Sequence, residues 1–132
     1  SAPVTAAMPM GVDGFSYADL HAPARLRDLH AVFCQGVAAA DPPLWTEWSA
    51  YAAAPDAQRP ATEVSDLIVR MAPHVSRFVS RLFRIDEATA ALLRLGGAIL
   101  RDFGRAKALR IWRVDVVRGI ERRRHRGEHS GP

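Results

Sequence analysis

The stretch SDLIVRMAPHVSRFVSRLF, residues 65–83, decides the fold of this chain. Its apolar residues recur every three or four positions, a spacing that places side chains on one face of an α-helix. They are Leu67, Ile68, Met71, Val75, Phe78, Val79 and Leu82. Pro73 lies among them and removes one backbone hydrogen bond from the helix. We expect this segment to be the central helix of the core.

Two shorter helices are expected before the central helix. Pro23 suits a first helical turn, where its missing N–H costs nothing, and apolar residues at helical spacing follow it to about Ala40. Asp41 and Pro42–Pro43 start the next helix, because the carboxylate can accept free amide hydrogens and proline has a helical φ. Residues 1–20 contain prolines, glycines and then aromatic residues, which predicts an extended N-terminal arm.

Two more helices are expected after the central helix. A short leucine-rich helix follows Asp86, and Gly96–Gly97 either ends it or weakens it. The polar residues 125–132 predict a disordered tail. The last helix has an apolar side made of Leu109, Trp112, Val116 and Ile120.

No stretch of useful length alternates between polar and apolar residues as a strand does. We therefore predict an all-α fold, a single-domain bundle of four to five helices over residues 21–124. The arm precedes this bundle, and a basic C-terminal tail follows it.

The charge of the chain is unevenly distributed. The 132 residues carry a formal net charge of +4. Residues 1–100 contain eight basic and ten acidic side chains, whereas residues 101–126 contain ten basic and three acidic ones. The basic character therefore belongs to the C-terminal segment.

Cysteine content and the first residues indicate a compartment. Cys34 is the one cysteine of the chain, so an internal disulfide and a thiolate-based zinc or iron-sulfur site are excluded. Residues 1–14 have neither a cationic start nor a sustained apolar run, so they resemble no signal peptide or membrane anchor. We expect a cytoplasmic protein without a membrane span.

The sequence predicts no catalytic, cofactor-binding or metal-binding residue in this chain. His30 and Cys34 are four residues apart and share a helix face, but two ligands without a third favour a structural role. Gly96–Gly97 has neither a preceding strand nor a following Lys-Ser or Lys-Thr, so it is not a phosphate-binding loop. We therefore expect that the chain is not an enzyme.

Three groups of residues are candidates for binding a partner. Trp45 and Trp48 lie three apart on one helix face, which suits a core position or a protein interface. A stripe of arginines borders the apolar face of the central helix, and a second cluster ends the last helix. These arginines are Arg70, Arg77, Arg81 and Arg84 in the stripe, and Arg118, Arg122, Arg123 and Arg124 in the cluster.

Several stretches resemble a known family. They are GFSYADLHAPARLRDLHAVF (14–33), DPPLWTEWSAY (41–51), SDLIVRMAPHVSRFVSRLF (65–83) and IWRVDVVRGIERRR (111–124). They are similar to the N-terminal helical region of large proteobacterial FAD-dependent, iron-sulfur oxidoreductases related to the glutamate synthase small subunit. The resemblance implies an accessory helical module without cofactors of its own. FAD and iron-sulfur clusters would belong to a larger subunit or to the remainder of the same polypeptide.

The expected function is therefore docking within an oxidoreductase complex. Two alternatives remain open. The arginine-rich C-terminus of a small basic regulator could bind nucleic acid, with steep salt dependence. A small ligand could instead occupy a pocket near Trp45, Trp48 and Phe78.

Overall fold

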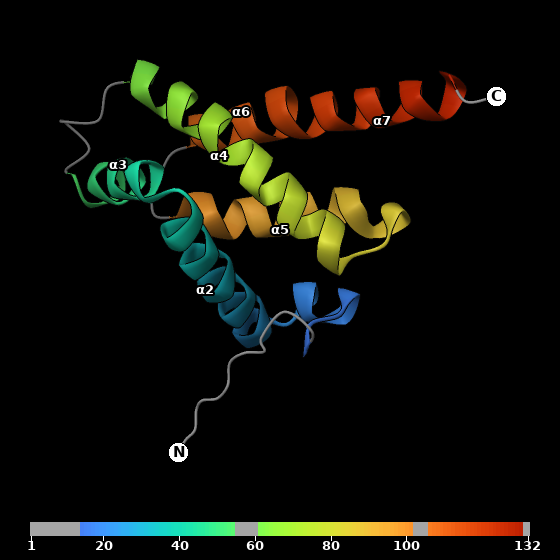
Figure 1. Cartoon of the computed structure of the whole chain (residues 1–132), viewed down its shortest axis with the longest axis horizontal. Coiled ribbons are helices and arrows are strands. Elements are labelled where there is room, and N and C mark those ends of the chain that lie inside the picture. Colours follow the sequence, from blue (N-terminus) through green and yellow to red (C-terminus); the bar gives the residue numbers. More distant parts are fainter. Residues whose placement is uncertain (1–13, 55–60, 102–105, 131–132) are drawn as a thin grey trace.

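The computed structural model describes residues 14–54, 61–101 and 106–130. Within these residues five helices pack into one bundle and no strand occurs, which confirms the predicted all-α fold (Figure 1). The helices are α2 (Pro23–Ala40), α3 (Pro42–Ala53), α4 (Ala61–Leu82), α5 (Ala88–Leu100) and a C-terminal helix that joins α6 (Ala106–Ile111), a π-helical segment (Trp112–Val117) and α7 (Arg118–Ser130). A 3-10 turn, Ile85–Glu87, precedes α5.

The boundary between α2 and α3 lies where the sequence predicts it. α2 runs from Pro23 to Ala40, and α3 begins at Pro42. Asp41 lies between them, and its Oδ1 accepts a hydrogen bond from the Leu44 amide at 3.3 Å. This carboxylate caps the first turn of α3, where the amides have no partner within the helix.

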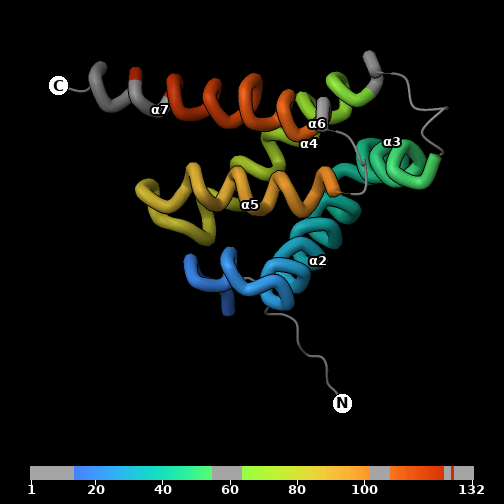
Figure 2. The backbone as a smooth tube through the Cα atoms, turned by 180° about the vertical axis from the view of Figure 1, so that it is seen from behind, coloured from blue at the N-terminus to red at the C-terminus, as the bar shows by residue number. Residues whose placement is uncertain are grey.

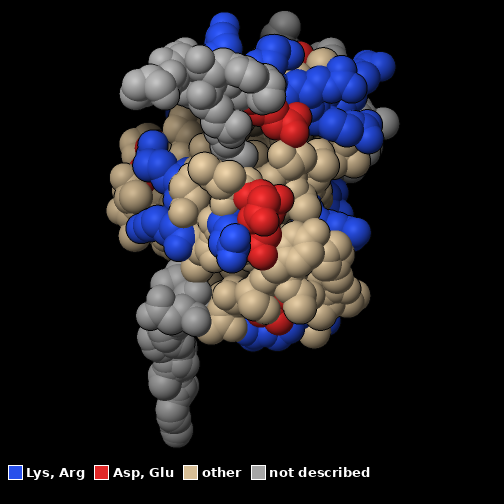
Figure 3. Space-filling view, turned by 90° about the vertical axis from the view of Figure 1, so that its right-hand side faces the viewer, with Lys and Arg blue, Asp and Glu red and all other residues tan. Residues whose placement is uncertain are grey.

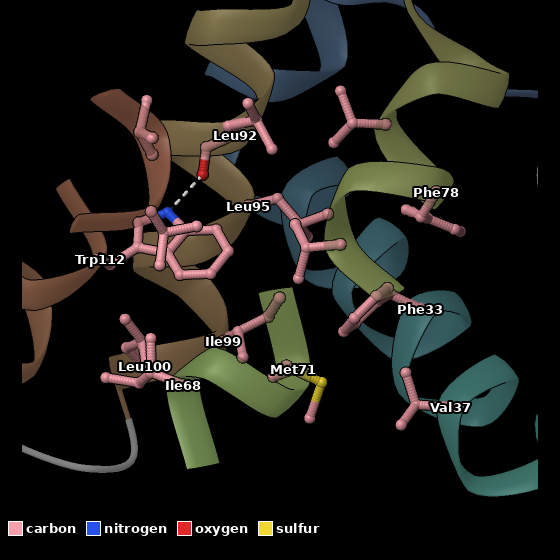
Figure 4. Close-up of a cluster of buried hydrophobic side chains, with 14 of the residues drawn as sticks. Phe33, Val37, Ile68, Met71, Phe78, Leu92, Leu95, Ile99, Leu100 and Trp112 are labelled. Carbon is pink, nitrogen blue, oxygen red and sulfur yellow. Dashed lines mark hydrogen bonds between the residues drawn. The ribbon is translucent and has the colours of Figure 1, made fainter. Parts of the chain in front are cut away.

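The central position of α4 is also confirmed. It contacts α2, α3, α5 and the C-terminal helix, and it continues through Pro73 to Leu82. Its predicted apolar stripe is buried from Leu67 to Val79, with Leu82 partly buried. Figure 4 shows Ile68, Met71 and Phe78 among side chains from the other helices. The core therefore forms around this helix.

The glycine pair of α5 does not end that helix, which continues through Gly96–Gly97 to Leu100. Gly96 instead lies against Trp112 of the C-terminal helix, and a Cβ at position 96 would lie 2.0 Å from the indole Nε1. The absent side chain lets this Nε1–H donate to the Leu92 carbonyl at 2.9 Å (Figure 4). The glycine thus permits close contact between the two helices.

In the C-terminal helix four buried residues recur at a spacing of four, and Val117 is buried beside them. Ala108, Trp112, Val116 and Ile120 face the bundle, whereas Leu109 is 41% exposed, so the predicted apolar side is wrong at that position. A spacing of four drifts by about 40° per step around an ordinary α-helix. The π-helical turn from Trp112 to Val117 is wider, so it accommodates this drift and keeps the buried positions aligned.

The two ends of the described chain are more helical than the sequence predicts. Residues Tyr17–His21, expected to be extended, form a 3-10 helix, in which the Ser16 amide donates to Asp19 Oδ2 at 2.8 Å. α7 continues to Ser130, past the predicted limit at residue 124, because arginine and glutamate favour a helix that is already nucleated. Residues 1–13 of the predicted arm lie outside the described residues.

The helices lie in a simple arrangement. In Figures 1 and 2 the C-terminal helix runs along one edge of the bundle, α5 lies next to it, and α2 lies on the far side. Among the described helices, none combines the length and the apolar content needed to cross a membrane.

Candidate partner-binding surface

A groove of about 330 Å³ lies between α4 and the C-terminal helix. Most of its lining is apolar and comes from both helices. The residues that line it are Val69, Ala72, Pro73 and Ser76 of α4, and Asp115, Val116, Ile120 and Arg123 of the C-terminal helix. The residues on α4 follow helical spacing and so form one continuous face.

The groove is open because its two helices diverge. α4 contacts α6 and the π-helical segment, and Figures 1 and 2 show it descending from there away from the C-terminal helix. Ala72 and Ser76 are too small to fill the resulting space. Val69 is 63% exposed at its edge. Apolar residues of the kind that a helix normally buries against its neighbours therefore remain accessible to solvent along this groove.

Arg123 lines this groove, and Arg118 and Arg122 precede it on the same helix. Arg118, Arg122 and Arg123 are exposed, and in the described part of the chain no carboxylate oxygen lies within 4.0 Å of their nitrogens. The nearby Glu121 accepts a hydrogen bond from the Thr89 hydroxyl of α5 at 2.9 Å instead. Figure 3 shows the basic side chains gathered over the end of the C-terminal helix. The side chain of Arg124, also predicted here, lies outside the described residues.

Arg70 of the predicted stripe makes its contacts within the fold. Its guanidinium donates two hydrogen bonds to Glu47 of α3, at 2.7 and 2.9 Å, and one to Asp66 at 3.3 Å. Hydrogen bonding to Arg70 lowers the pKa of Glu47, and the two carboxylates raise the pKa of Arg70. Such bidentate pairing fixes orientation as well as charge, so Arg70 ties α3 to α4.

Arg77 of the stripe belongs to a second internal network. Its Nη2 lies 3.2 Å from His74 Nδ1, and His74 Nε2 lies 3.0 Å from Asp41 Oδ2. Because arginine only donates, Nδ1 accepts, and the ring proton on Nε2 points to Asp41. The hydrogen bond from His74 is the largest cause that lowers the pKa of Asp41; burial opposes it, and the hydrogen bond from the Leu44 amide adds a smaller lowering effect. The network links the α2–α3 boundary to α4.

The remaining arginines of the stripe, Arg81 and Arg84, are exposed, and Arg84 Nε lies 3.5 Å from Asp86. The stripe as a whole does not meet the groove. Residues 70, 77 and 81 lie on α4 roughly 100° around the axis from residues 69, 73 and 76. The structure therefore separates the two predicted arginine clusters onto different faces.

The two tryptophans face a second cavity, of about 460 Å³, between α2, α3 and α5. Trp48 is 5% exposed and packs in the core rather than on a partner-facing surface, and Trp45 is partly buried. His30 and Cys34 line the same cavity, but the described residues hold no group of three or more metal-ligand side chains. Phe78, predicted to share this pocket, instead packs edge-on against Phe33, with ring centroids 5.2 Å apart.

The groove itself was not foreseen from the sequence. Its α4 wall consists of Val69, Ala72, Pro73 and Ser76, which lie on the side of the helix away from the apolar stripe. The one available signal is Val69, an apolar residue outside that stripe. The opposite wall depends on the π-helical turn, whose signal is the repeated spacing of four.

A comparison with known families gives one match. The model described as "RP005 N-terminal alpha-helical domain" matches residues 10–84, more than half of the chain. This region contains α2, α3 and α4. No curated protein and no solved structure matches the chain.

Proposed function

The chain belongs to the family of the RP005 N-terminal alpha-helical domain. From the sequence resemblance described above and from the groove, we propose that it is a non-catalytic docking or accessory module of an iron-sulfur flavoprotein oxidoreductase complex. Its partner is a larger subunit or the remainder of the same polypeptide. The FAD and the iron-sulfur clusters belong to that partner, and this chain supplies a binding surface.

The main support for the docking role is the groove with its adjoining arginines. The apolar wall that includes Val69 gains free energy when a partner covers it. Arg122 and Arg123 lie next to it without acidic partners in the described residues. An apolar centre with a charged rim is the usual composition of a protein–protein interface.

The class of partner is supported by the resemblance. The stretches that carry the resemblance are 14–33, 41–51, 65–83 and 111–124, and the family match by itself names no oxidoreductase. They consist of packing and capping residues such as Asp41 and Phe78. They therefore support a shared helical module rather than a shared active site.

The test is affinity capture of the tagged chain from its source cells. We would work at about 0.3 M salt with nuclease, because salt weakens binding to nucleic acid steeply and an apolar interface much less. The captured material is examined by mass spectrometry and assayed for flavin and iron. Recovery of a flavin- and iron-containing protein in roughly equal amount supports the proposal. Recovery of other proteins alone contradicts it.

A matched pair of variants identifies the surface. Replacing Arg118, Arg122 and Arg123 together with alanine should reduce capture, whereas replacing Arg81 and Arg84 should not. Nucleic-acid binding is the competing function, favoured by the same three exposed arginines. Retention on nucleic acid at low salt, its loss at about 0.3 M salt and the absence of a flavoprotein would favour that function.

A further inference from the structure

The shape of the groove suits the binding of one more helix. Its two walls are helices, α4 and the C-terminal helix, that diverge from a region of contact. Side chains of a third helix fit between two such ridges, as in other helix-in-groove complexes. Ala72 and Ser76 have short side chains, so a third backbone can approach α4 closely. A regular apolar stripe on that helix would cover Val69.

The charges along the groove restrict what this helix can carry. Asp115 and Arg123 both line the groove, and eight residues of helix separate them, or about 12 Å. Arg122 adds a second cation beside Arg123. The complementary helix therefore has acidic residues at the Arg123 end and a neutral or basic residue about two turns away, opposite Asp115.

We propose that the groove between α4 and the C-terminal helix binds an acidic amphipathic helix of the oxidoreductase partner, an inference that rests on the proposed function. A second copy of this chain is a poor occupant, because its net charge of +4 would be opposed by the same arginines. The acidic helix instead supplies both the apolar stripe and the missing counter-charges.

The first experiment finds the preferred helix without knowledge of the partner. The probe is a displayed library of helices with a fixed leucine stripe and flanking positions that are glutamate, lysine or alanine. Selection on the whole chain should enrich glutamate over lysine by about tenfold at one end of the helix, which corresponds to about 1.4 kcal/mol. Enrichment of lysine, no charge preference, or no binder overturns the proposal.

Matched variants then locate the bound helix. Val69→Asp should weaken the selected peptide by at least about tenfold, because it places a carboxylate on the apolar wall. Ile85→Asp is its control, because Ile85 is 71% exposed, against 63% for Val69, and lies outside the groove. Arg123→Glu should also weaken binding and Arg113→Glu, in the same helix but outside the groove, should not. Equal effects of the two members of either pair overturn the proposal.

The same variants separate this inference from the proposed function. Wild-type capture decides whether a flavoprotein partner exists, and the peptide titration decides what the groove binds. If wild type and Val69→Asp capture equal amounts of the flavoprotein, the groove is not the binding site of that protein, although the docking function stands. If no flavoprotein is captured, the docking function fails, and Val69-dependent binding of the acidic peptide alone still supports the groove. Far-UV circular dichroism of each variant excludes loss of folding, since all four side chains are exposed.

Discussion

Replacing Gly96 with alanine tests the contact that holds the C-terminal helix on α5. The added Cβ would lie 2.0 Å from Nε1 and 2.4 Å from Cε2 of Trp112, whereas atoms in van der Waals contact are about 3.5–4.0 Å apart. The indole therefore has to move by about 1.5 Å. This movement breaks its hydrogen bond to the Leu92 carbonyl.

The expected loss of stability combines three contributions. Overpacking a core costs about 1–3 kcal/mol, and leaving a buried donor without its partner costs about 1–3 kcal/mol. The better helix propensity of alanine offsets about 1 kcal/mol of this. We therefore expect Gly96→Ala to lower the free energy of unfolding by about 3 kcal/mol, and the Tm by about 10 °C for a domain of this length.

The adjacent glycine provides the control. A Cβ at Gly97 would have no other atom within 4 Å, so Gly97→Ala should stabilise the protein by about 1 kcal/mol through helix propensity alone. Thermal and urea unfolding, followed by far-UV circular dichroism, measure both variants. The reasoning is refuted if Gly96→Ala is as stable as wild type, or if both alanines destabilise equally.

Three further predictions concern other contacts. Trp112→Phe removes the indole donor but keeps an aromatic ring, so it should destabilise by about 1–2 kcal/mol in urea unfolding, and an unchanged midpoint would contradict the role of this hydrogen bond. Pro73→Ala gives the Val69 carbonyl an amide partner, so it should raise the free energy of unfolding by about 1–3 kcal/mol in urea unfolding, and a lowered midpoint would contradict this expectation. The pKa values of Asp41 and Glu47 are lowered in the folded state from 3.8 and 4.5, so their contribution to stability is present above those values and lost as the pH falls through the lower folded values. The Tm difference between wild type and Asp41→Asn or Glu47→Gln should accordingly narrow from pH 7 to pH 3, and a constant difference would rule out this linkage.

Local chemistry explains the parts of the fold that the sequence predicts well. Pro23 and Asp41 mark helix starts through their own backbone and side-chain preferences. The stripe from Leu67 to Val79 is buried because a spacing of three and four already defines one face. These signals need no knowledge of what packs against them.

The features that were not predicted depend on partners distant in sequence. Gly96–Gly97 has the local signature of a helix end, but the bulk of Trp112 determines its role. Arg70 and Arg77 have the spacing of a solvated stripe, and only the positions of Glu47 and His74 show that they are used within the fold. The groove likewise requires the relative placement of two helices whose lining residues are 39 or more positions apart along the chain, from Ser76 to Asp115.

The wide turn at Trp112–Val117 also sets the rotational phase of everything that follows it. If the same six residues were wound as an ordinary α-helix, the larger rotation per residue would turn α7 by roughly 100° about its own axis. Trp112 would keep its place against Gly96, while Arg123 would point away from α4. The wide turn thus determines the direction in which the charged part of this helix faces relative to its packed part.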